Sequence, residues 1–287
     1  MLSRRLQILP ILSVEYRFRT VPPICDESDL MNFLTHWSLQ RAPFGPLATA
    51  DAFFAGAPQR EAIARLEYLI RSESRAALLL AERGCGTTTL LKRVSGTSGL
   101  GNAAVDAFVT CGPAKSPDVA LARLAVEMSI DPFAPGLGRR LSEAIGASGR
   151  NQVRVLWMID RCDPASAEAA ASLAAGNRWL TTVLSTAPCD AANLSCWLDC
   201  CPLRVDLEPL SLDDSIGYLR YCLAMAGGRE DIFEDTAAVR LHELSEGKLA
   251  LLSAMAQVAL LAAAALRVDT VSAQCVESAQ HELVRAA

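Results

Sequence analysis

The stretch that decides the fold is Ala81-Glu82-Arg83-Gly84-Cys85-Gly86-Thr87-Thr88-Thr89, which follows an apolar run and precedes a predicted helix. It follows the pattern G-x-x-x-x-G-K-[ST], in which successive backbone N–H groups and a helix N-terminus surround a phosphate. Gly86 takes the second glycine position, Gly84 permits the tight turn, and Thr88 supplies the hydroxyl that binds magnesium. Ala81 and Thr87 replace the first glycine and the lysine. We interpret the stretch as a phosphate loop, with a glycine-rich turn that binds nothing as the alternative.

A second apolar strand that ends in an acidic residue favours the phosphate loop over the plain turn. Val153–Ile159 is strongly apolar, and Asp160 follows it. In P-loop proteins such an aspartate helps to hold magnesium. The next residue is usually a glutamate that orients the attacking water, and here it is Arg161. Thr88 and Asp160 are therefore the candidate metal ligands, and Asp160 and Arg161 are candidates at the catalytic position.

Strand and helix patterns alternate along the middle of the chain, which indicates a parallel sheet covered on both faces. The expected strands are Ala76–Leu80, Ala104–Thr110, Val153–Ile159, Trp179–Leu184 and Leu203–Leu207. After Pro209 only helical patterns follow, at Ser211–Ala226, Thr236–Leu244, Lys248–Leu266 and Thr270–Ala286. We predict three parts: an N-terminal extension and opening segment (1–44), an α/β nucleotide-binding domain (45–208) and a helical lid (209–287).

Composition and charge narrow the classes of function. The net charge is -5 and the pI is near 5.3, which argues against general nucleic-acid binding. Ten cysteines are scattered through the chain, which favours free thiols in a reducing compartment and hence the cytoplasm. Leu249–Leu266 is apolar but contains Ser253 and Gln257, so we expect a core helix and no membrane span. The first residues are read as a disordered extension or an early start codon.

Several segments besides the loop resemble one known family. They are His36-Trp37 with Pro43-Phe44, Phe53-Phe54 before Glu61–Leu66, Pro209-Leu210-Ser211, Ala226-Gly227-Gly228 and Ser245-Glu246-Gly247. From about Phe33 to its end, the chain resembles the AAA-type ATPase domain of general secretion pathway protein A and its relatives. The resemblance implies a P-loop NTPase fold with a helical lid, ATP and Mg²⁺ as cofactors, homo- or hetero-oligomers with AAA subunits, and a partner in envelope or secretion machinery.

The resemblance also implies further site residues and shows where this chain departs from the family. Ser185 falls at the first sensor position, after the strand Thr182-Val183-Leu184. The family's lid motif, glycine-x-proline-arginine, falls on Gly247-Lys248-Leu249-Ala250, where Lys248 is a candidate substitute for the missing arginine. Adenine is expected near Phe53–Gln59. With the family's residues absent at Ala81, Thr87, Arg161 and Ala250, we predict weak nucleotide binding and impaired hydrolysis.

Two alternatives remain open at this point. One is a non-enzymatic scaffold or partner of active AAA subunits, and the other is a DNA-associated ATPase of the transposition type. Among Cys189, Cys196, Cys200 and Cys201, the pair Cys196 and Cys200 has a spacing that suits zinc, but Cys201 and Cys189 do not extend it, so scattered structural thiols are favoured over a zinc site. Cys85 lies near a helix N-terminus, where thiol pKa values are generally lowered, so we hypothesise that its oxidation blocks nucleotide entry. His242 is expected to be a half-buried packing residue.

Overall fold

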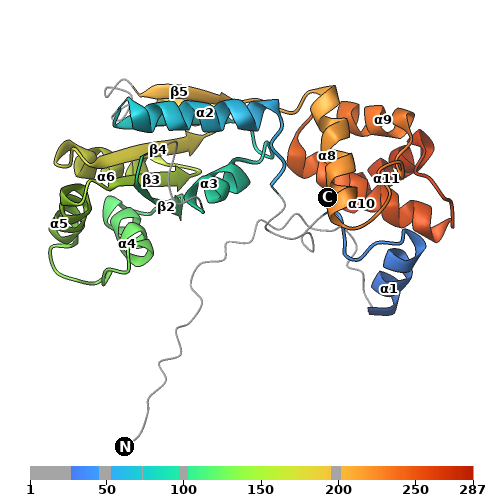
Figure 1. Ribbon diagram of the computed structural model, residues 1–287, viewed down its shortest axis with the longest axis horizontal. Coiled ribbons are helices and arrows are strands. Elements are labelled where there is room, and N and C mark those ends of the chain that lie inside the picture. Colours follow the sequence, from blue (N-terminus) through green and yellow to red (C-terminus); the bar gives the residue numbers. More distant parts are fainter. Residues whose placement is uncertain (1–26, 45–52, 73, 97–102, 195–201, 287) are drawn as a thin grey trace, which may run out of the picture.

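The computed structural model of this chain describes residues 27–44, 53–72, 74–96, 103–194 and 202–286. The predicted N-terminal extension falls largely on residues 1–26, which lie outside the described residues. Figure 1 shows a sheet flanked by helices and, beyond the strand ends to which the arrows point, a group of helices. We call these the α/β lobe (the described part of residues 53–207) and the helical lobe (residues 27–44 and 210–286).

The α/β lobe is built on a five-stranded parallel sheet with the order β2-β3-β4-β1-β5. Its strands are β1 (Ala76–Ala81), β2 (Val105–Cys111), β3 (Arg154–Asp160), β4 (Leu180–Thr186) and β5 (Leu203–Leu207). Every residue of β3 and β4 is buried, as expected for the central strands of a parallel sheet covered on both faces. The α/β fold class predicted from the sequence is therefore confirmed.

Helices cover both faces of this sheet, so the lobe has three layers. They are α2 (Ala57–Arg71), α3 (Thr87–Ser95), α4 (Pro117–Glu127), α5 (Leu137–Arg150) and α6 (Pro164–Ala175), and a short 3-10 helix, η1 (Pro188–Leu194), follows β4. Ala77 and Leu79 of β1 pack in one core with α2 and α3. Leu78 and Leu80 pack in the opposite core with α4, α5 and α6. This alternation follows from the two-residue period of a strand.

The carboxyl ends of β1, β3 and β4 meet at one edge of the sheet. Ile159 of β3 pairs with Leu184 of β4, and Leu184 pairs with Leu78 of β1. The next residues of β3 and β4, Asp160 and Ser185, therefore lie at the same level, close to the loop that leaves β1. Ligands of open α/β folds bind at this edge.

The helical lobe contains α1 (Glu27–His36), α8 (Leu212–Met225), α9 (Asp235–Ser245), α10 (Leu249–Ala265) and α11 (Ala273–Ala286). The opening segment packs into its core, since Phe33, Trp37 and Phe44 are buried among residues of these helices. The indole N–H of Trp37 also donates a hydrogen bond to the carbonyl of Leu260, at 3.2 Å. We did not predict α1 from the sequence, although Leu30, Phe33, Leu34 and Trp37 have the spacing of one helix face.

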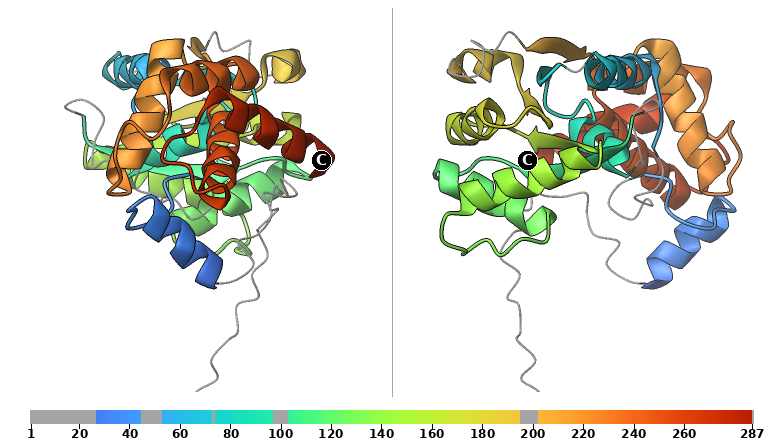
Figure 2. Two further views of the ribbon diagram at one scale, coloured as in Figure 1. Left: turned by 90° about the vertical axis from the view of Figure 1, so that its right-hand side faces the viewer. Right: turned by 60° about the vertical axis from the view of Figure 1, so that its left-hand side comes forward.

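The most apolar helix, α10, is a core helix, as predicted. Leu252, Ala256 and Leu260 are fully buried. In the described part of the chain, no helix combines the length and the apolar character needed to cross a membrane. Seen from the helical side, the helical lobe lies in front of the sheet (Figure 2, left), and so it faces the carboxyl edge of the strands.

Candidate functional site

The loop between β1 and α3 has the backbone of an anion cradle. Gly84 and Gly86 both have φ +92°, in the left-handed region that glycine adopts without steric cost. The N–H of Leu90, in the first turn of α3, bonds back to the carbonyl of Gly86 at 2.9 Å. By helix geometry, the N–H groups of Gly86, Thr87, Thr88 and Thr89 have no acceptor within α3. Such a helix N-terminus favours bound anions.

The carboxylate of Asp160 lies at the centre of this edge and is 1% exposed. The hydroxyl of Thr88 donates a hydrogen bond of 2.6 Å to its Oδ2, and the hydroxyl of Ser185 donates one of 3.1 Å to its Oδ1. The structure thus brings together three residues predicted from separate segments: the start of α3, the end of β3 and the end of β4. Hydrogen bonds that a carboxylate accepts are about twice as strong as those between neutral groups.

Arg161 follows Asp160 in an unusual backbone conformation. Its φ is +53°, which is uncommon for a residue other than glycine. Its N–H donates to Ser185 Oγ at 3.1 Å, and the next N–H, of Cys162, donates to the Ser185 carbonyl at 2.7 Å. Its guanidinium Nε lies 3.9 Å from Asp160 Oδ2. A cation therefore stands beside the candidate metal ligand, at the position where the resembled family has a glutamate.

The N-terminus of α10 rests on the phosphate loop. The N–H of Ala250 donates to the carbonyl of Gly84 at 2.9 Å. Lys248 Nζ lies 3.0 Å from Glu82 Oε2 and 2.7 Å from Glu246 Oε2. The hydrogen bond to Glu246, followed by that to Glu82, raises the pKa of Lys248, and Lys248 in turn lowers the pKa of Glu246. The candidate lid cation is thus held between two carboxylates.

Gly247 is required where the chain enters α10. Its φ is +70°, and a Cβ there would lie 2.1 Å from the carbonyl oxygen of Leu210. Leu210 N–H donates to the Gly247 carbonyl at 2.9 Å. This close approach ties the start of α10 to the segment that leaves the α/β lobe, and so fixes the position of Lys248 over the loop.

Cys85 does not have the environment that we predicted for it. It is 1% exposed and packs in the core beneath α2 and α3. Burial, followed by the charge of Glu82, raises the pKa of its thiol. The hypothesis of a lowered pKa is therefore wrong, because the side chain points into the core, where the thiolate is poorly solvated.

The remaining candidate side chains form no further centre in the described residues. Cys189 is an exposed free thiol, whereas Cys196, Cys200 and Cys201 lie outside the described part of the chain. Within that part, no group of three or more His, Cys, Asp or Glu side chains could hold a metal ion. His242 is half-buried, as predicted, with Nδ1 2.9 Å from Ser215 Oγ.

The expected adenine region contains a buried amide that sequence reasoning did not single out. Gln59 is 1% exposed. Neither atom of its carboxamide has a hydrogen-bond partner among the described residues. A Cβ on Gly56 would lie 2.7 Å from Gln59 Oε1 and 2.9 Å from Leu210 Cδ2, so the amide lies at the junction of the two lobes. Only the tertiary structure reveals that it is buried.

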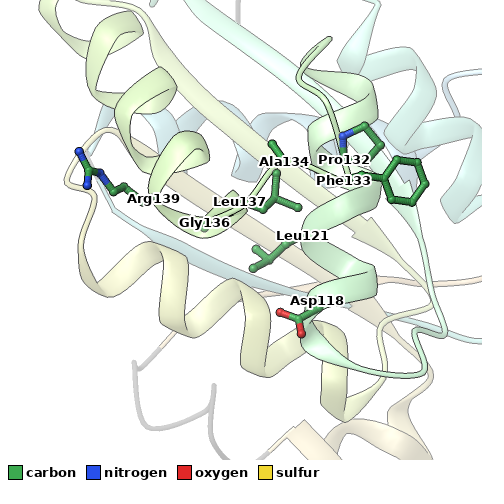
Figure 3. A pocket seen from close by; sticks show the side chains of 9 residues that line it. Asp118, Leu121, Pro132, Phe133, Ala134, Gly136, Leu137 and Arg139 are labelled. Carbon is green, nitrogen blue, oxygen red and sulfur yellow. The ribbon is translucent and has the colours of Figure 1, made fainter.

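A hollow of about 490 Å³ lies elsewhere, between α4 and α5. Figure 3 shows its lining, with Asp118 and Arg139 at separate ends and apolar side chains between them. Phe133 at its rim is 91% exposed. None of the predicted site residues lines this hollow, so the loop edge remains the candidate site.

Comparisons with known proteins identify the fold. No protein-family model and no curated protein matches the chain. Among solved structures, the Aeropyrum pernix ORC1 protein in complex with DNA is similar with a TM-score of 0.61 and 15% identity, covering 87% of this chain and 69% of that one. The Aeropyrum pernix ORC2 protein, in ADPNP–ADP complexes, gives 0.57 and 16%, covering 78% and 66%. The Thermotoga maritima RuvB Holliday junction branch migration motor gives 0.51 and 15%, covering 78% and 68%. The chain has the fold of AAA-type P-loop NTPases.

Proposed function

We propose that this protein is an AAA-type module that binds ATP at the loop edge and hydrolyses it very slowly. The observation that carries the proposal is the contact of 2.6 Å between Thr88 and Asp160, with Arg161 beside it. Thr88 and Asp160 provide the hydroxyl and the carboxylate of a nucleotide site. The arginine stands where turnover needs an acceptor for the attacking water.

In this proposal, each element of the site has a role that its chemistry allows. The N–H groups of the loop Ala81–Thr89 hold the phosphates. Thr88 and Asp160 offer the hard oxygen ligands that suit Mg²⁺, which when bound would neutralise phosphate charge. Ser185 orients Asp160 and the turn at Arg161. Gly247 and Lys248 close the site from the helical lobe, and the base lies toward Phe53–Gln59.

The replaced residues account for weak binding and slow turnover. A lysine at position 87 would add a charge-assisted contact of about 1.5–3 kcal/mol, and Thr87 cannot supply it. A guanidinium has donors and no acceptor, so Arg161 cannot take up or orient the proton of a water molecule. The loss of such a group lowers catalytic rates about 10³-fold or more.

The proposal is tested by calorimetry with ATP and ADP and by phosphate release, on the wild type and on Thr87→Lys. We expect weak ATP binding by the wild type and about tenfold or more tightening in Thr87→Lys, the factor that corresponds to one charge-assisted contact. Thr89→Lys adds the same charge at an exposed neighbouring position and should not tighten binding comparably. Wild-type hydrolysis at about 1 s⁻¹, a rate typical of working enzymes, would contradict the proposal.

A scaffold without nucleotide is the second candidate, and one observation favours it. Lys248 is already paired with Glu82 and Glu246, and Ala250 with Gly84, so groups of the protein itself cover part of the loop. No heat and no thermal stabilisation with ATP or ADP would support this candidate. It would then act as a partner of active AAA subunits.

We also propose a compartment and partners for the protein. We place the protein in the cytoplasm because its cysteines are scattered. We place it in an oligomer with AAA subunits, next to secretion or envelope machinery, on the resemblance of its segments alone. The acidic net charge of -5 opposes general DNA binding, whereas the similar ORC1 structure is a DNA complex. A salt-sensitive shift with duplex DNA would favour the DNA-associated alternative.

A further inference from the structure

We infer that Arg161 is a built-in cation of the phosphate site, so that nucleotide binds with an affinity that does not depend on Mg²⁺. The inference rests on the proposed nucleotide site and assigns to it a different counter-charge. It concerns only the binding step.

The position of the guanidinium carries the inference. Arg161 Nε lies 3.9 Å from Asp160 Oδ2, and the same oxygen accepts the hydrogen bond from Thr88 Oγ1 at 2.6 Å. These are the two oxygens that would face a magnesium ion. The arginine therefore supplies positive charge at the point where the metal would supply it.

The main chain holds Arg161 in this place. Its left-handed φ of +53° is secured by hydrogen bonds from its own N–H and from Cys162 N–H to Ser185. Gly112 packs against the turn so closely that a Cβ there would lie 2.2 Å from the carbonyl oxygen of Arg161. Gly112 N–H also donates to the Asp160 carbonyl at 2.7 Å. Residues with unfavourable backbone angles persist where the surroundings determine them and often mark functional positions.

The guanidinium of Arg161 and a magnesium ion would compete for the carboxylate of Asp160. Mg²⁺ needs oxygen ligands at about 2.0–2.1 Å and gives up its water reluctantly. A permanent positive charge beside Asp160 repels a divalent ion. A planar guanidinium fork also suits the oxygens of a phosphate. The side chain is 41% exposed, so it lies within reach of a ligand at the edge.

The test is a calorimetric titration of ATP into the full chain, once in excess Mg²⁺ and once in EDTA. For the wild type we expect dissociation constants that agree within about threefold in the two conditions, because a fixed charge replaces the ion. Arg161→Gln should lose about tenfold or more of its affinity in EDTA and regain part of it with Mg²⁺. Arg161→Lys, which keeps the charge, should remain independent of the metal.

Arg140→Gln is the matched control, since it removes an exposed arginine of α5 and should bind ATP like the wild type in both conditions. Circular dichroism and thermal unfolding show whether each variant is folded. Wild-type binding that is tenfold or more tighter with Mg²⁺ than in EDTA would overturn the inference and leave the proposed function standing. Absence of binding in both conditions would overturn the proposed function and the inference together.

Discussion

Replacing Ser185 by alanine should lower the free energy of unfolding more than the same replacement of a serine at the protein surface. Its hydroxyl joins the Asp160 carboxylate to the Arg161 N–H, with distances of 3.1 Å to each. Ser185 is 2% exposed and Asp160 is 1% exposed, so water cannot easily replace the lost bonds. A hydrogen bond to a charged group contributes about 1.5–3 kcal/mol, and an unpaired N–H costs up to about 1–3 kcal/mol when fully buried, less for the partly buried N–H of Arg161. Because both effects arise at one atom, we expect a combined loss of about 2–4 kcal/mol.

The assay is urea unfolding followed by circular dichroism, with Ser95→Ala as the matched control. Ser95 Oγ donates to the Lys92 carbonyl at 2.9 Å near an exposed helix end, so its loss should cost within about 0.5 kcal/mol. The double variant Thr88→Val with Ser185→Ala should deviate from additivity, since both hydroxyls bind the same carboxylate. If Ser185→Ala unfolds like Ser95→Ala, then Asp160 is not held as described and the reasoning fails.

Three further predictions concern residues around the loop. Gln59→Leu should raise the free energy of unfolding by about 1 kcal/mol, because it removes a buried amide with no described partner; a clear loss of stability would show that the amide is satisfied. Cys85, whose thiol pKa burial raises, should react with iodoacetamide more slowly than the exposed Cys189; mass spectrometry that finds Cys85 labelled first would refute this. The pKa of Glu246 lies below its ordinary value of 4.5 because of Lys248, so this pair stabilises the fold above that pH and the contribution is lost as pH falls through the lowered pKa. In Glu246→Gln, the free energy of unfolding should fall less between neutral and acid pH than it does in the wild type. An equal fall in both proteins would contradict the prediction.

The sequence predicted the sheet well, because buried parallel strands are continuous apolar runs. Leu203–Leu207 coincides with β5, and the run before Asp160 is β3. The same pattern could not reveal that Trp37 belongs to the core of the helical lobe, because its partner Leu260 is more than two hundred residues away. Local periodicity carries no information about such a contact.

The sequence predicted which residues form the site, but it did not predict which of these residues contact one another. Thr88, Asp160 and Ser185 could each be found from motif positions, and parallel strand ends placed them at one edge. That Lys248 pairs with Glu82 depends on how the helical lobe rests on the loop. Likewise the burial of Cys85 depends on which way a loop side chain turns, and a general rule about helix N-termini gave the wrong sign for its pKa.

The departures of this chain from the resembled family are better understood together than one by one. The usual lysine, glutamate and arginine carry charges of +1, −1 and +1, which sum to +1. Thr87, Arg161 and Ala250 carry 0, +1 and 0, which also sum to +1. In the proposed site, the positive charge for a phosphate would come from Arg161 beside Asp160, and no side chain at that position could accept a proton from water. A site that binds nucleotide without turnover requires the three changes to compensate one another, and the metal dependence of ATP binding by Arg161→Gln tests this.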